Sequence, residues 1–91
     1  MSAAIDLAAT IRQRLAALEP AALELMDESG RHVGHEGAKS GGSHFRLTIV
    51  SARFAGVATR ERHRMVYAAL GELMGREIHA LAIAARAPDE L

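Results

Sequence analysis

Histidine is the residue type in this chain that is best suited to site chemistry. Five imidazoles occur in 91 residues, at His32, His35, His44, His63 and His79. Neutral imidazole is a common ligand for zinc and iron. The chain has no cysteine, which excludes disulfides, thiolate catalysis and an iron–sulfur cluster held by thiolates of this chain alone.

The two histidines nearest in sequence, His32 and His35, form an H-x-x-H pattern. In a loop this spacing is a weak indication of a structural zinc site, which usually needs four ligands. A zinc hydrolase would also need a general base, and Glu36 is the only candidate, with no supporting residues placed around it. Two ligands with open positions instead favour a metal centre that is shared with another molecule.

The elements that must position these histidines follow from the spacing of apolar residues. Apolar side chains recur at helical spacing up to Pro20, which ends the helix, and they alternate with polar ones after Ser43. The predicted elements are a helix over 5–18, a strand over 23–27, a glycine-rich loop over 28–42, a strand over 44–50, a helix over 59–74, a strand over 78–84 and a short polar tail over 87–91. Thr59 is a better N-cap for the second helix than Ala58, and Gly75 is its expected C-terminal stop.

The order α-β-β-α-β predicts a single α+β domain over 1–91, since 9.7 kDa leaves no room for a second core. The last β-α-β unit should be a right-handed parallel crossover, and the first two strands should form a hairpin with an overlong loop. A mixed sheet of three strands with both helices on one face makes a two-layer sandwich.

This topology groups four of the five histidines. The loop 28–42, His44 and His79 should all lie at the end of the sheet where the two parallel strands begin. His63 falls in the first turns of the second helix, which starts where the preceding strand has ended, about 23 Å away at ~3.3 Å per residue. We therefore expect His63 to be structural rather than a ligand. If it packs under the preceding loop, its ring nitrogens should be hydrogen-bonded to nearby groups.

The charge of the chain is balanced, with 11 basic and 11 acidic side chains. This balance argues against general attraction to nucleic acid or to an anionic membrane. No apolar run approaches the roughly 20 residues that a membrane span needs, and the N-terminus lacks the basic start of a secretory signal. We expect a cytoplasmic protein with no membrane partner.

Four arginines nevertheless gather around the start of the second predicted helix, at Arg53, Arg60, Arg62 and Arg64. Cations at a helix N-terminus oppose the helix dipole, so they do not serve helix stability. A phosphate-facing patch is one explanation, with Arg60, Arg62 and Arg64 as its residues. A solvated face partly balanced by Glu61 is the other.

Residues Gly34 to Gly37 also form a G-x-x-G pattern, by which KH domains clamp a nucleic-acid backbone. In KH domains this loop joins two helices, whereas here it lies between two predicted strands. A turn-rich loop that needs glycine at positive φ is the simpler explanation.

Six short segments occur in the order and spacing of one known family: Asp27-Glu-Ser29, His32-x-x-His35-x-Gly37, Ser43-His-Phe45, Phe54-x-Gly56, Arg62-His-Arg64-x-Val-Tyr67 and Ile78-His-Ala-Leu81. Through them the chain resembles the BolA family, in its histidine-loop subtype, over about residues 5–88. It departs from the family at Ala58-Thr59, where Ser-Pro is frequent, and at Ala87-Pro88, where Thr-Pro is frequent.

The resemblance implies the BolA fold, which is similar to type II KH domains, and a function without catalysis. BolA-like proteins pair with monothiol glutaredoxins and share a [2Fe-2S] cluster with them, in iron–sulfur trafficking or iron sensing. By position the implied ligands are His79 and, in the loop, His35, with His32 as the competing loop ligand. The glutaredoxin thiolate and glutathione would serve the other iron. Some BolA proteins are held to be DNA-binding transcriptional regulators, which is the alternative function for this chain.

Overall fold

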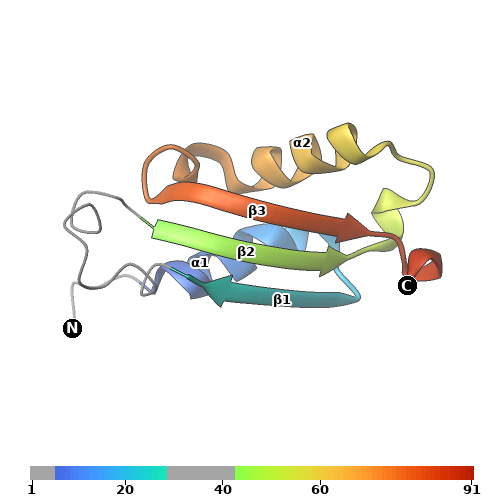
Figure 1. Ribbon diagram of the computed structural model, residues 1–91, viewed down its shortest axis with the longest axis horizontal. Helices are drawn as coiled ribbons and strands as arrows, with labels where there is room; N and C mark the ends of the chain where they lie inside the picture. The colour runs from blue at the N-terminus through green and yellow to red at the C-terminus, as the bar shows by residue number, and fades with distance from the viewer. Residues whose placement is uncertain (1–5, 29–42) are drawn as a thin grey trace.

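Helices and strands follow one another along the chain in the predicted order α-β-β-α-β. The computed structural model describes residues 6–28 and 43–91, so the predicted loop over 28–42 lies outside the described residues except for Glu28. The elements are α1 (Leu7–Leu15), β1 (Ala22–Asp27), β2 (Ser43–Val50), α2 (Thr59–Leu70) and β3 (Ile78–Arg86). Figure 1 shows α1 behind the sheet and α2 running along β3.

The three strands form one mixed sheet in the order β1-β2-β3. β1 pairs antiparallel with β2, with Leu25 opposite Leu47. β2 pairs parallel with β3, with Leu47 opposite Ile83. The parallel pair is joined through α2, which confirms the predicted crossover and the mixed three-stranded sheet.

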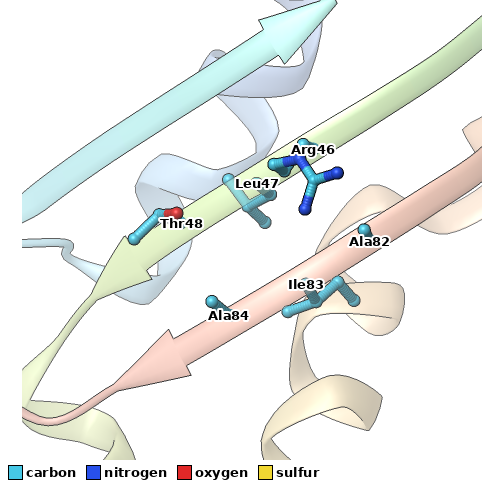
Figure 2. Close-up of a pocket in the computed structure, with 6 residues that line it drawn as sticks. All are labelled: Arg46, Leu47, Thr48, Ala82, Ile83 and Ala84. Carbon is cyan, nitrogen blue, oxygen red and sulfur yellow. The ribbon is translucent and has the colours of Figure 1, made fainter. Parts of the chain in front are cut away.

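The core lies between the helices and one face of the sheet. Its fully buried side chains come from both helices, from β2, from the turn after β2 and from the start of β3, and they include Ile11, Leu15, Leu47, Ile49, Phe54, Val66, Leu70 and Ile78. Alternation along β2 places Leu47 and Ile49 on the covered face and Arg46 on the other. On that uncovered face a shallow hollow of about 130 Å³ lies over β2 and β3. Figure 2 shows its small side chains, Ala82 and Ala84, across from Arg46 and Thr48.

The ends of α2 differ from the sequence prediction. Ala58 is the N-cap, and no side chain caps the first turn, so the prediction of Thr59 as the cap is wrong. The helix ends at Leu70, followed by Gly71 at φ +60° and a 3₁₀ turn over Gly71–Leu73. The Arg14 guanidinium on α1 donates to the Leu70 carbonyl at 3.0 Å. A contact between helices therefore satisfies the helix end that sequence pattern extended to residue 74.

The last five residues are more than a polar tail. Ala87 is fully buried, and Pro88–Glu90 form a 3₁₀ turn. Figure 1 shows this turn at the carboxyl ends of β2 and β3. It packs there because Glu90 accepts hydrogen bonds from the Arg62 guanidinium of α2.

Across residues 6–28 and 43–91, no helix combines the length and the apolar character that crossing a bilayer demands.

Candidate functional site

His44 and His79 lie side by side at the start of the two parallel strands. Their ring centroids are 5.2 Å apart, and the ring planes are stacked at an angle of 23°. The prediction that these two histidines converge at one end of the sheet is confirmed. His32 and His35 lie outside the described residues, so their place at this end stays a prediction.

A β-bulge determines how His79 is presented. Ser43 pairs with Ile78 and His44 pairs with Ala80, so His79 is the extra residue on β3. A bulge of this kind turns a side chain away from the regular pleat. The His79 side chain is exposed and that of His44 is half-buried. Nothing in the sequence pattern indicated the bulge, because Ile78 to Ala84 is apolar on both faces and suits any register.

The backbone around the two histidines is held on both sides. The Glu28 N–H donates to the His44 carbonyl at 2.8 Å, and the Gly75 N–H donates to the Ile78 carbonyl at 3.0 Å. Ile78 is fully buried in the core next to His79. The imidazole of His79 therefore projects from a fixed backbone, which is the condition for a pre-positioned ligand.

These residues provide an incomplete metal site. Within the described part of the chain, no group of three histidine, cysteine or acidic side chains is placed to hold a metal ion. His44 and His79 supply at most two imidazoles. Glu28 and Ser43, which flank the segment containing His32 and His35, lie at the same end of the sheet. Such a site suits a metal centre whose other ligands come from elsewhere.

His63 lies far from this end of the sheet, as predicted. It borders a surface hollow together with Ala85 and Arg86, at the carboxyl end of β3. The stretch of β3 from His79 to Ala85 spans about 20 Å at ~3.3 Å per residue. Its ring makes no hydrogen bond to another described residue. The half-buried ring borders two hollows along α2, so the condition for the expected hydrogen bonds, packing under the preceding loop, is not met.

Arg62 does not belong to an exposed basic patch, which corrects the sequence prediction. Its side chain points inward and is only 8% exposed. The guanidinium donates to the carbonyls of Val57 at 2.6 Å and Ala85 at 3.0 Å, and to both carboxylate oxygens of Glu90 at 2.7 and 2.6 Å. Sequence reasoning missed this pair, since 28 residues separate its members.

The Arg62 hydrogen bonds, together with one from the Ala87 N–H, lower the pKa of Glu90 to about 2. Glu90 in turn raises the pKa of Arg62. Arg60 and Arg64 remain exposed on α2, with Arg64 Nε 3.8 Å from Glu61. Arg53 pairs with Glu19 at 3.1 Å. Of the predicted basic patch, only Arg60 and Arg64 are thus available to a partner on this helix.

The family model for BolA-like proteins matches residues 15–90 of this chain. The protein is a member of the BolA family. BolA-like protein 1 of Homo sapiens is 49% identical over 81 residues, which cover 88% of this chain and 57% of the human protein. The protein named DNA-binding transcriptional regulator BolA in Escherichia coli is 42% identical over 78 residues, covering 80% of this chain and 71% of that protein.

The BolA fold is also found in a solved structure. The BolA domain of SufE1 from Arabidopsis thaliana superposes with a TM-score of 0.79 at 38% identity, and covers 98% of this chain and 100% of that one. The predicted α+β fold is therefore that of BolA domains. The chain spans less than two thirds of the length of the mammalian BolA-like proteins it matches.

Proposed function

We propose that this BolA-family protein is a non-enzymatic adaptor in iron–sulfur cluster trafficking or iron sensing. It binds a monothiol glutaredoxin and shares a [2Fe-2S] cluster with it. The observation that carries the proposal is the position of His79, which is exposed at a β-bulge and stacked beside His44. Both lie at the end of the sheet where the chain leaves for, and returns from, the segment containing His32 and His35.

The residues present fit a shared cluster better than a resident one. The chain has no cysteine, and the described residues place no more than two imidazoles together. His79 would bind one iron with His35 from the loop, or with His32 in its place. The thiolate of the glutaredoxin and glutathione would bind the other iron. Two-histidine ligation of one iron raises the reduction potential of a [2Fe-2S] cluster above that of all-thiolate clusters.

The experiment that tests this function is reconstitution with a monothiol glutaredoxin, glutathione, iron and sulfide, followed by size exclusion and visible absorption spectroscopy. The expected result is a coloured complex of the two proteins whose spectrum differs from that of the glutaredoxin alone. A glutaredoxin spectrum that is unchanged by this protein, with no co-elution, would contradict the proposal.

DNA binding is the second candidate, because the Escherichia coli relative is named a DNA-binding transcriptional regulator. The exposed Arg60 and Arg64 on α2 would supply phosphate contacts, without Arg62. Affinity for duplex DNA measured at several salt concentrations tests it, since each phosphate contact steepens the salt dependence. A flat salt dependence or no affinity would exclude this role.

A further inference from the structure

The outer edge of β3 exposes backbone hydrogen-bonding groups. β3 is the last strand of the sheet. The Arg86 carbonyl faces β2, where it accepts from the Ser51 N–H, and the Ala85 carbonyl faces away, where it accepts from Arg62. Because successive residues of a strand alternate in this respect, the N–H and C=O groups of Leu81 and Ile83 also face outward. None of these four groups has a hydrogen-bond partner within residues 6–28 and 43–91.

Over residues 78–85, the sequence of β3 carries none of the residues that usually guard an edge strand against pairing. Natural edge strands are commonly guarded by charged side chains, proline or a cover. Residues 78–85 contain neither a charge nor a proline. The open stretch has defined limits, because the bulge at His79 interrupts it at one end and the Arg62 guanidinium occupies Ala85 at the other. It therefore has room for a segment of about five residues at ~3.3 Å per residue.

A basic groove runs beside the open edge. One hollow of about 410 Å³ is lined by residues of α2, the second half of β3 and the C-terminal turn, including His63, Ile83 and Arg86. A second hollow of about 280 Å³ is lined by Arg60, His63, Arg64 and Tyr67. The two meet at His63. Among the described residues that line the two hollows, the only acidic one is Glu90, which is paired with Arg62. The other charged lining residues are the exposed Arg60, Arg64 and Arg86, and Glu61, which lies 3.8 Å from Arg64, is not a lining residue.

These observations together select the occupant. A second copy paired through β3 about a two-fold axis normal to the sheet would bring the two α2 helices together on one face, with Arg60 and Arg64 opposed to their like charges. A single-stranded nucleic acid would need stacking platforms, but among the described aromatic residues only Tyr67 is exposed, while Phe45 and Phe54 are buried. An extended acidic peptide matches both the unpaired strand and the charge of the groove.

We propose that the edge of β3 and the groove along α2 form a docking site for an extended acidic segment of a partner protein, which adds a strand to the sheet. The four outward groups of Leu81 and Ile83 supply main-chain hydrogen bonds. Arg60, Arg64 and Arg86 bind its acidic side chains. The open stretch begins just beyond His79 on β3. Its test uses no iron, sulfide or glutaredoxin, so failure of this proposal is distinguishable from failure of the cluster experiment.

The test is an NMR and fluorescence-anisotropy titration of the full chain with a labelled heptapeptide of alternating glutamate and valine. The expected result is saturable binding, with shifts at the amides of Leu81 and Ile83 and at least tenfold slower hydrogen exchange of those amides at saturation. A peptide of the same sequence carrying N-methyl groups on alternate residues should bind much more weakly, because it cannot complete the ladder. A lysine–valine peptide should not bind.

The charge requirement is tested with the double variant Arg60→Glu/Arg64→Glu, in which both changes lie on the exposed face of α2. Its affinity for the acidic peptide should fall by about tenfold or more through charge repulsion. The matched control Arg12→Glu/Arg76→Glu makes the same change of net charge at exposed positions outside the groove, and should bind like the unmodified protein. Thermal unfolding checks that both variants are folded.

Several outcomes would overturn the proposal: no binding of the acidic peptide, equal binding of the N-methylated peptide, or binding without any effect at Leu81 and Ile83. Tighter binding of a thymidine oligonucleotide to the same edge would assign it to nucleic acid instead. Protection of the two amides that depends on protein concentration, with a dimer in sedimentation, would assign it to a second copy.

Discussion

His79 stacks on His44 because a β-bulge makes His79 the extra residue between the Ser43–Ile78 and His44–Ala80 pairs. The bulge lies where β2 and β3 begin, next to the fully buried Ile78. Backbone hydrogen bonds on both sides of the two strands hold it in place. An exposed imidazole on an immobile backbone is suited to bind a ligand that a second protein brings.

Substitution of His79 by alanine is expected to abolish the mixed [2Fe-2S] complex, because the only neighbouring imidazole in the described part of the chain, His44, belongs to another strand and is half-buried. Visible absorption and circular dichroism of the reconstituted mixture measure this. His63→Ala is the matched control, since His63 lies at the other end of β3 and should leave the spectrum unchanged. A wild-type mixed-cluster spectrum from His79→Ala would show that the site is wrong.

The loop ligand should show redundancy. His35→Ala is expected to weaken the mixed complex or shift its spectrum without abolishing it, since His32 is only three residues away. The double change His32→Ala/His35→Ala should then resemble His79→Ala. Glutaredoxin binding without cluster, measured by calorimetry, should survive in all three variants because protein contacts and metal ligation are separate contributions. A double variant that still forms the wild-type complex would exclude both loop histidines.

The ion pair of Arg62 and Glu90 should make stability depend on acid pH. The pKa of Glu90 is about 2 in the folded protein, against its ordinary value of about 4.5. The unfolded chain therefore binds more protons between these values, and the stabilisation is complete above pH 5 and is lost as the pH falls toward 2. Urea unfolding from pH 6 to pH 2.5 should show this loss. Glu90→Gln should be less stable at pH 6 and should show a shallower decline; an identical pH profile would contradict the assignment.

Ser51 should be a larger determinant of stability than its size suggests. It is fully buried, and its hydroxyl donates to the Leu18 carbonyl at 2.6 Å and accepts from the Arg53 N–H at 3.1 Å. Ser51→Ala leaves both backbone groups without this partner, so the free energy of unfolding should fall by about 1–3 kcal/mol. Chemical denaturation measures the change, and a loss below the error of the measurement would show that water replaces the hydroxyl.

The matched control for Ser51 is Thr59→Ala at the start of α2. Because Ala58, and not Thr59, is the N-cap and no side chain caps this end, the substitution should change the free energy of unfolding by no more than about 0.5 kcal/mol. A loss of about 1 kcal/mol or more would be the signature of a lost cap, and would restore Thr59 to that role.

The sequence by itself determined the element order, the parallel crossover, and the proximity of His44 and His79 at one end of the sheet. These follow from local periodicity, which depends on neighbouring residues, and from the handedness of the crossover, which is the same in nearly all proteins. The central residues of each helix and strand were predicted in the same way. The motifs also identified the family, because they extend over nearly the whole chain in a constant order.

Only the tertiary structure decided the bulge at His79, the end of α2 at Leu70 and the inward direction of the Arg62 side chain. Each depends on a contact between residues distant in the chain: the pairing of β2 with β3, Arg14 with the Leu70 carbonyl, and Arg62 with Glu90. An arginine on a helix looks the same in the sequence whether it faces water or a buried carboxylate. Its direction is set by the packing of the last strand and turn against that helix, and no local pattern records that packing.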